Sequence, residues 1–395
     1  MHTNAPTLKP SATGPGWGKT LLLTLPMALL TGMLLSGGPP SSNGPQGWLK
    51  TAPFLIDWLL VNTLFFLMVR TGKTDRYRAV LFVTMAGCFV LSFIANLIEM
   101  RGSMSISQEE MIQGHTPFCH MVIPMTLIPA ALTRTIIFPG SILEGFAAVA
   151  TMFTIWIAAS LIMGRGWCGW GCFFGGLEDG FSRLRRKALI KHIAPRWTYL
   201  PYAVLLVVVL TSAASLSPTY CEWLCPFKTV TEYARIDSLL RLAQTAIFVS
   251  LFVGLVVVLP LLTKRRTQCG LFCPFGAFQS AANYVSPVDI RVNPELCTGC
   301  ERCAGLCPTF SLTRSSIAAG KPRASCCRCG KCADACPKGA ITYHVKGTPP
   351  GHRPGAARLL FLFPALLFLA TFSAGSIQDT MRRLYFLVTT GSVLH

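Results

Sequence analysis

CTGCERCAGLCP (residues 297–308) and its repeat CCRCGKCADACP (residues 326–337) decide how the rest of the chain is interpreted. In each run, three closely spaced cysteines can bind three irons of one [4Fe–4S] cube, while a fourth cysteine, followed by proline, ligates the other cube. The spacing therefore predicts two clusters with crossed ligands. The first would be held by Cys297, Cys300, Cys303 and Cys336, and the second by Cys326, Cys329, Cys332 and Cys307.

Over residues 290–346 this pattern resembles the bacterial two-cluster ferredoxins, and both halves match in spacing. The alternative is a zinc or disulfide scaffold. Zinc sites usually pair two Cys-x2-Cys units across a longer gap and lack the Cys-Pro ending, so the cluster interpretation is favoured. Cys327 adds a thiol beside Cys326 that the pattern does not require. We interpret it as a packed side chain and assign it no ligand role.

The composition is that of a membrane protein. Of 395 residues, 52% are hydrophobic and only 13% are charged. The chain has 17 cysteines, most of them in regular short-spaced motifs, which favours metal ligation in a reducing compartment over disulfides. The net charge of +19 is concentrated beside apolar runs, as expected of cytoplasmic loops, so nucleic acid is not expected as a partner.

The apolar runs predict five to seven membrane spans after an N-terminal lead at residues 1–19. Five runs are well supported: Ala52–Val69, Ala79–Ile98, Ile142–Met163, Tyr199–Leu216 and Leu242–Leu262. Thr20–Ser36 is either an uncleaved anchor, which we favour, or a signal peptide. Leu359–Ala374 is a shorter candidate for a last span. Arg and Lys in the loops place residues 70–78, 164–198 and 264–266 on the cytoplasmic side.

Two features of the apolar region depart from a simple span, an interrupted segment and an acidic residue. Met121–Phe138 is apolar but contains Pro124, Pro129 and Arg134, and the charges of the next loop fit only if this segment does not cross the membrane. Asp57 lies within a predicted span, where an ionisable side chain indicates function. The alternative, which we favour from the sequence, is that Asp57 lies near the membrane interface, where a charge is tolerated.

Three further cysteine pairs share a four-residue separation, which places both thiols of a pair on one face of a helix. They are Cys168/Cys172, Cys221/Cys225 and Cys269/Cys273. The predicted topology brings Cys168, Cys172, Cys269 and Cys273 to one inner-side metal site and leaves Cys221 and Cys225 as an outer-side site. Inert packing is the alternative for each pair. Cys119 and His120 would lie near the outer pair, where they could assist it or a haem, although we favour an ordinary role.

These pairs, as in WCGWGC (residues 167–172) and CGLFCPFG (residues 269–276), resemble the NapH-, NosR- and CcoG-like membrane polyferredoxins over roughly residues 142–346. The resemblance departs at Phe173, where the family has proline, and in its third pair. It implies a mostly α polytopic membrane domain with an inserted small α+β ferredoxin domain. We expect a membrane domain at 20–289, the two-cluster domain at 290–346, a linker at 347–358, and a hydrophobic segment with a tail at 359–395.

The expected function is electron transfer in a prokaryotic inner membrane, with the ferredoxin domain in the cytoplasm. Electrons would pass between a cytoplasmic or quinone-pool partner and a membrane or exported enzyme, the partner being a reductase, cytochrome or metalloenzyme. The basic side chains of Arg302, Arg328 and Lys331 would raise the cluster potentials or simply form a solvated face.

Three other functions are open. A quinol dehydrogenase would use quinone near His115, His120, Glu109 and Glu110. A maturation factor would supply electrons or metal to a partner enzyme, and a redox sensor ranks last because no output domain is recognisable. No catalytic motif competes with these interpretations.

Overall fold

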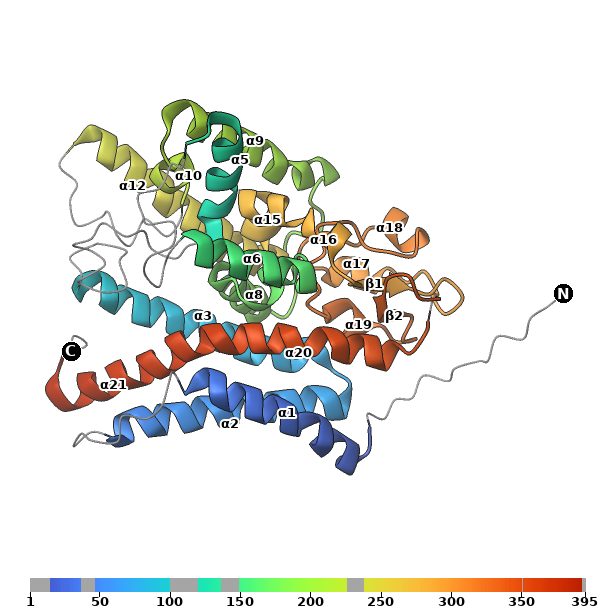
Figure 1. Cartoon of the computed structure of the whole chain (residues 1–395). Helices are drawn as coiled ribbons and strands as arrows, with labels where there is room; N and C mark the ends of the chain where they lie inside the picture. Colours follow the sequence, from blue (N-terminus) through green and yellow to red (C-terminus); the bar gives the residue numbers. More distant parts are fainter. Residues whose placement is uncertain are drawn as a thin grey trace.

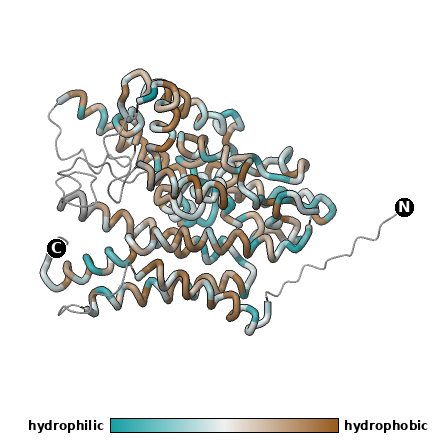
Figure 2. Tube along the Cα trace, in the orientation of Figure 1, coloured by the Kyte–Doolittle hydropathy of each residue, from teal (hydrophilic) through white to brown (hydrophobic). Residues whose placement is uncertain are grey.

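The computed structural model describes residues 15–36, 47–99, 120–135, 149–225, 238–349 and 351–392. Long helices lie side by side along one axis, and a lobe of short helices and two strands occupies one end of them (Figure 1). Hydrophobic residues dominate the long helices, whereas the lobe is largely hydrophilic (Figure 2). This division matches the predicted membrane domain and ferredoxin domain.

Three N-terminal helices and the C-terminal helix form the first layer. They are α1 (Trp17–Leu35), α2 (Gly47–Thr71), α3 (Thr74–Glu99) and α20 (Pro354–Ser373). α20 continues through η6 (Ala374–Gln378), a π-helical turn, into α21 (Asp379–Thr390). α1 packs against α2 and α20, and α2 packs against α3. The first and last segments of the chain therefore share one layer (Figure 1).

The second layer contains the middle of the chain. It includes η1 (His120–Val122), α5 (Ile123–Thr133), α6 (Val149–Met163), η2 (Pro195–Tyr199) and α9 (Leu200–Ser215). Its last long helix comprises α12 (Leu239–Leu251), the π-helical η5 (Phe252–Val258) and α13 (Leu259–Thr263). Six short helices lie among them: α7 (Gly166–Trp170), α8 (Phe173–Leu184), α10 (Thr219–Trp223), α14 (Thr267–Leu271), α15 (Pro274–Gln279) and α16 (Ala282–Val285).

Six helices of the described residues are long and apolar enough to cross a membrane. They are Trp17–Leu35, Gly47–Thr71, Thr74–Phe93, Pro195–Ser215, Leu239–Thr263 and Pro354–Thr390. Six such helices confirm the predicted polytopic architecture. The first and the last of them, which correspond to the two less certain predicted spans, also have spanning length. The predicted span Ile142–Met163 appears as the shorter α6, and its first residues lie outside the described part of the chain. α5 is also too short to span, in agreement with the non-crossing prediction.

The lobe is built around a two-stranded antiparallel sheet. β1 (Val288–Val292) pairs with β2 (Ile341–Val345), with Ile290 opposite Tyr343. Along the chain, three short helices follow β1 and precede β2: α17 (Arg302–Leu306), α18 (Arg314–Ala318) and α19 (Lys331–Ala335). Because alternate residues of a strand face the same side, the side chains of Val288, Ile290 and Val292 are buried together in the core of the lobe.

The lobe is attached to the helices by side chains that bond to backbone groups. Asp334 accepts hydrogen bonds from the N–H groups of Thr74 and Asp75, which have no partner within α3, at 2.9 and 2.8 Å. Arg328 donates to the carbonyl of Met163 at 2.8 Å. Asn283 donates to the carbonyl of Cys326 at 2.8 Å.

The basic loops also gather at the lobe end of the molecule. Lys73, in the α2–α3 loop, donates to the carbonyl of Asp334 at 2.9 Å. Lys264 donates to the carbonyl of Arg185, and the backbone N–H of Arg266 donates to the carbonyl of Pro308 at 2.9 Å. The three loops that the charge pattern assigned to one side therefore lie at the same end of the molecule.

Candidate iron–sulfur sites

The first predicted set of ligands surrounds one cavity of the lobe. Its lining includes all four cysteines, Cys297, Cys300, Cys303 and Cys336, together with Pro337 and Ile341. Burial raises the pKa of Cys303, and the neighbouring Cys297 and Cys336 raise it further. Cys336 is distant from the other three in sequence but adjacent in space, as the crossed pattern requires. We call this set the first cluster site.

The second predicted set also converges. Burial raises the pKa of Cys326 to about 12, and the neighbouring thiol of Cys307 contributes to the increase. Burial raises the pKa of Cys332 well above its ordinary value, with contributions from Cys326, Cys329 and Cys307. The thiol of Cys307 also accepts a hydrogen bond from the N–H of Ser311 at 3.2 Å. We call Cys307, Cys326, Cys329 and Cys332 the second cluster site.

The two cysteine runs share one backbone conformation. The residue before the second cysteine of each run has a positive φ, 68° at Gly299 and 52° at Arg328. The residue after the second cysteine also has a positive φ, 53° at Glu301 and 83° at Gly330. A short helix then carries the third cysteine. Positive φ is unfavourable for a side chain, and Arg328 is held by hydrogen bonds to Met163 and Ser286.

The two pairs assigned to the inner side also share a local structure. Cys168 lies within α7 and Cys172 is the residue that precedes α8. In the same way, Cys269 lies within α14 and Cys273 precedes α15, where its sulfur accepts from the N–H of Gly276 at 3.3 Å. Each pair is therefore a one-turn helix followed by a thiol at the start of the next helix.

The four thiols of these pairs lie together and are buried. Burial raises the pKa of Cys269 well above its ordinary value, and Glu178, Cys172, Cys273 and Cys168 all add to this effect. No three Cys, His, Asp or Glu side chains of the described residues converge closely enough to hold a single metal ion. Ligands of a cubane stand further apart, because each binds a different iron. We call Cys168, Cys172, Cys269 and Cys273 the inner thiol site.

The inner thiol site directly adjoins the second cluster site. Gly169 approaches the carbonyl oxygen of Cys327 so closely that a side-chain carbon at Gly169 would lie 2.2 Å from it. Only glycine permits this contact. Arg266 donates to the carbonyl of Cys168 at 3.1 Å, while its own backbone N–H bonds to Pro308, next to Cys307. Cys327, fully buried, thus lies at the boundary between the two thiol sets.

A network of buried charges surrounds this boundary. Arg78 pairs with Asp75 at 2.7 Å and with Asp179 at 2.9 Å, and Arg266 pairs with Asp179 at 3.2 Å. Arg183 pairs with both aspartates. Although burial alone would raise it, the pKa of Asp179 is held far below its ordinary value by Arg266, Arg78 and Arg183. Sequence reasoning missed this network because its members are far apart in the chain.

Arg165 differs from the other buried arginines of this region. It is 2% exposed and donates to the carbonyl of Cys269 at 2.9 Å and to Ser280 at 2.8 Å. It forms no ion pair with any carboxylate of the described residues, and its Nε has no hydrogen-bond partner. The acidic groups within electrostatic reach of it include the thiols of Cys168, Cys327 and Cys269, which would carry negative charge as cluster ligands. A buried, unpaired guanidinium is unfavourable, so this donor set fits an anionic cluster bound by thiolates.

The third pair does not join the other two. Cys221 lies in α10 and Cys225 follows it, at the end of α9 farther from the lobe (Figure 1). The hydroxyl of Tyr220 nevertheless reaches back to Gln268, beside Cys269, at 3.4 Å. The third pair therefore stands apart from the inner thiol site, and its role as a metal site stays a prediction.

The predicted position of His120 is wrong. We expected it beside Cys221 and Cys225, but its ring packs against Phe275 and Trp167 with centroids 4.8 and 5.7 Å apart. The next residue, Met121, places its sulfur 3.9 Å from that of Cys273. The non-crossing segment therefore carries His120 to the inner thiol site. Cys119, His115, Glu109 and Glu110 lie outside the described residues.

Two further predictions change with the structure. Arg328 is 2% exposed, so it belongs to no solvated basic face. Asp57 is 0% exposed and is the eleventh residue of α2, because the helix begins at Gly47 rather than at Ala52. Asp57 is thus buried well inside a helix of spanning length, and its depth in the membrane stays a prediction.

Comparisons with known proteins agree with this geometry. A 4Fe–4S binding domain model matches three successive segments, residues 145–192, 197–241 and 245–293, each containing one Cys-x3-Cys pair. A second 4Fe–4S binding domain model matches residues 290–313. No solved structure matches the chain.

Several curated proteins match about two fifths of the chain. The putative electron transport protein YccM of Escherichia coli is 29% identical over 43% of this chain and 48% of its own length. The ferredoxin-type protein NapH of Haemophilus influenzae is 28% identical over 39% of this chain and 51% of its own. The regulatory protein NosR of Pseudomonas aeruginosa is 30% identical over 43% of this chain and 24% of its own. The chain thus spans about half the length of the first two.

The helical domain of spanning length and the cysteine-rich lobe together define a multi-pass membrane protein of the iron–sulfur type. Within that class the chain is similar to the NapH- and NosR-like membrane polyferredoxins.

Proposed function

We propose that this chain conducts electrons between a redox partner at its lobe and a second partner at or across the membrane, through three iron–sulfur clusters. Two [4Fe–4S] clusters would occupy the first and second cluster sites, and a third would occupy the inner thiol site. Bound clusters supply one-electron chemistry at potentials that charge, burial and hydrogen bonds adjust. The protein residues hold the clusters in order and shield the inner ones from water.

The contact between Gly169 and Cys327 is the observation that carries the proposal. It joins a thiol set of the lobe to a thiol set of the membrane domain with no intervening layer of side chains. The proposed path runs from the first cluster site through the second to the inner thiol site. At the first cluster site Cys300 is exposed, whereas the cysteines of the inner thiol site are buried. An electron would therefore enter or leave the lobe at the first cluster site and meet the membrane domain at the inner thiol site.

The orientation follows from the basic loops. The α2–α3 loop and the segment after α13 carry Arg and Lys and touch the lobe. Since positive loops remain in the cytoplasm, the lobe belongs on the cytoplasmic side of a prokaryotic inner membrane. The partner at the lobe would then be a cytoplasmic reductase or a quinone-linked protein, and the partner beyond would be a cytochrome or metalloenzyme.

Iron analysis of anaerobically purified protein tests the third cluster. We expect about twelve irons in the native protein, from three four-iron clusters, and about eight when Cys168 and Cys269 are both replaced by Ser. The matched control replaces Cys221 and Cys225 by Ser and should keep about twelve, because that pair stands apart from the inner thiol site. About eight irons in both the native protein and the C168S/C269S variant would contradict the third cluster.

The separate location of Cys221 and Cys225 favours a second candidate function, the maturation of a partner enzyme. Thiols there could handle a soft metal such as Cu(I). Deleting the protein separates the two functions. Electron delivery predicts that the partner enzyme keeps its cofactor but loses turnover, whereas maturation predicts that the cofactor itself is missing.

A further inference from the structure

Asp57 is an ionisable side chain inside the membrane domain that the proposed electron path does not use. Its carboxyl group lies ten residues into α2, or about 15 Å along the helix axis at 1.5 Å per residue. That depth is near the middle of a hydrocarbon core about 30 Å thick. The side chain is 0% exposed within the protein. An ionisable group kept at this depth indicates a functional site.

Two side chains of the C-terminal helix face Asp57. Ser373 donates to its Oδ2 at 3.4 Å, and Gln378 donates to the same oxygen at 3.2 Å. Gln378 also donates to the carbonyl of Leu35 in α1. The second oxygen, Oδ1, is buried and has no hydrogen-bond partner. The carboxyl group therefore has donors on one oxygen and an unused position on the other.

The π-helical turn η6 makes this arrangement possible. Residues five apart in an α-helix point about 140° away from one another, because each residue turns the chain by about 100°. In a π-helix, the hydrogen bond from residue i to residue i+5 brings such residues nearly above one another. The turn at Ala374–Gln378 thus directs Ser373 and Gln378 to the same carboxyl group. Such turns occur frequently at functional sites.

Charge decides what the site can bind. Asp57 forms no ion pair with a Lys, Arg or His of the described residues. Among the titratable groups of the packed helices, the thiol of Cys88 on α3 is within electrostatic reach. Asp379 follows Gln378 but is already paired with Arg383 at 2.7 Å. Burial without an ion pair favours the protonated carboxyl group, whereas the hydrogen bonds from Ser373 and Gln378 favour the ionised form, so Asp57 can change its protonation state.

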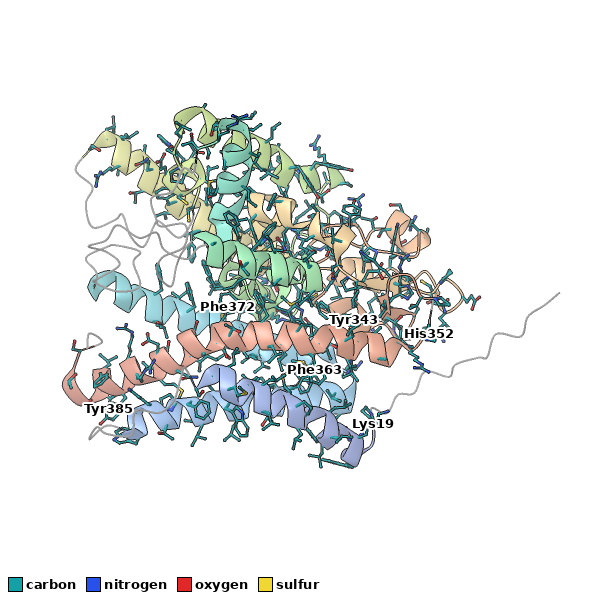
Figure 3. All side chains as sticks on the ribbon, viewed as in Figure 1. Lys19, Tyr343, His352, Phe363, Phe372 and Tyr385 are labelled. Atoms are coloured by element: carbon teal, nitrogen blue, oxygen red, sulfur yellow. The ribbon has the colours of Figure 1, made fainter. Side chains whose placement is uncertain are left out.

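A short series of contacts joins Asp57 to the inner thiol site. Phe372, beside Ser373, lies on the side of α20 that faces the thiol-bearing helices (Figure 3). Its ring is 6.2 Å from that of Trp167 and Phe368 is 4.6 Å from the same indole. Trp167 directly precedes Cys168. The helix α20 and one aromatic layer therefore lie between the carboxyl group and the thiols.

We propose that Asp57, Ser373 and Gln378 form a proton-binding site coupled to the inner thiol site. This inference rests on the proposed third cluster. When one electron arrives there from the second cluster site, the added negative charge disfavours a nearby carboxylate, and Asp57 takes up one proton from water. When the electron leaves, the proton is released. Ser373 and Gln378 hold the carboxyl group in place in both states.

Infrared difference spectroscopy of the cluster-loaded protein in lipid vesicles tests the proposal. Reduction should increase a carbonyl band of a protonated carboxyl group. This band should be absent in D57N, which keeps the size and the acceptor oxygen of the side chain. It should shift in Q378L, which removes one donor, and it should persist in D379N, whose carboxylate is ion-paired.

The outcomes separate this inference from the proposed function. If iron analysis shows no third cluster in the native protein, the proposed electron path fails. If three clusters are present and are reduced while no carboxyl band changes, or if D57N keeps the band, the proton site alone is overturned. If D57N does not fold, the test uses the other two proteins: the carboxyl band should increase when the native protein is reduced, and it should shift in Q378L.

Discussion

The carboxylate of Asp334 accepts a 2.8 Å hydrogen bond from the backbone N–H of Asp75, the second residue of α3. Asp334 lies between Cys332 and Cys336, two of the proposed cluster ligands, so this bond joins the lobe to a membrane helix. The first N–H groups of a helix have no partner within it, and a negative charge there is favourable. A side chain of one domain thus acts as the helix cap of another.

Replacing Asp334 by Ala should weaken this attachment. The N–H groups of Thr74 and Asp75 would lose their acceptor, at a cost of about 1–3 kcal/mol. Limited proteolysis should then cleave the lobe faster than in the native protein, while its iron content stays unchanged. The control is D289A, which removes the partly exposed ion pair between Asp289 and Arg291 of β1, worth about 0–1 kcal/mol. Equal cleavage of native protein and D334A would contradict the prediction.

Replacing Cys300 by Ala should remove one cluster and spare the others. Its thiol belongs to the first cluster site, which shares no ligand with the second. We expect a loss of about four irons and of one electron paramagnetic resonance signal. C327A is the matched control within the same lobe and should keep its full iron content, because Cys327 is assigned no ligand role. Iron loss in C327A would identify Cys327 as a ligand.

Replacing Arg165 by Gln should lower the midpoint potential of the cluster in the inner thiol site. The buried guanidinium stabilises the more negative, reduced form, and glutamine keeps hydrogen-bond donors but not the charge. R165K should restore part of the potential. R358Q removes another arginine that donates to backbone carbonyls, those of Met68 and Gly72, and should leave this potential unchanged. A redox titration in which R165Q matches the native protein would show that Arg165 only fills space.

Replacing Asp179 by Asn should destabilise the fold by about 3–5 kcal/mol, because Arg78 and Arg266 lose a buried partner. The pKa of Asp179 is lowered in the folded protein. Its stabilising contribution is therefore present above the ordinary value, about 3.9, and is lost as the pH falls toward the lower folded value. Thermal unfolding in detergent at several pH values measures both effects. The difference between D179N and native protein should shrink on acidification, and a constant difference would contradict this assignment.

The grouping of the cluster-site cysteines in space could be predicted because its signal is local. Cys297, Cys300 and Cys303 can bind one cube only at their observed spacing, and Pro308 and Pro337 mark the crossed ligands. The polytopic domain was predictable for a similar reason, since a span must consist of contiguous apolar residues. The convergence of Cys168 with Cys269 followed from the positions of basic loops.

What sequence reasoning missed depends on contacts between distant segments. Nothing near Arg165 indicates that it is buried without a carboxylate, and Asp334 looks like any polar residue of a loop. His120 was misplaced because α5 and η1 were positioned only by topology, without their contacts to Phe275. The π-helical turn that aligns Ser373 with Gln378 leaves no spacing that would distinguish it from an ordinary helix.

The attachment of the lobe through Asp334, Arg328 and Asn283 has a kinetic consequence. A carrier domain on a flexible tether must swing between donor and acceptor, and its turnover slows in viscous solvent. Here the lobe is bonded to the helices, so the distances between the proposed cluster sites are fixed. Internal electron passage should therefore be independent of glycerol concentration, leaving the encounter with the soluble partner as the only viscosity-sensitive stage.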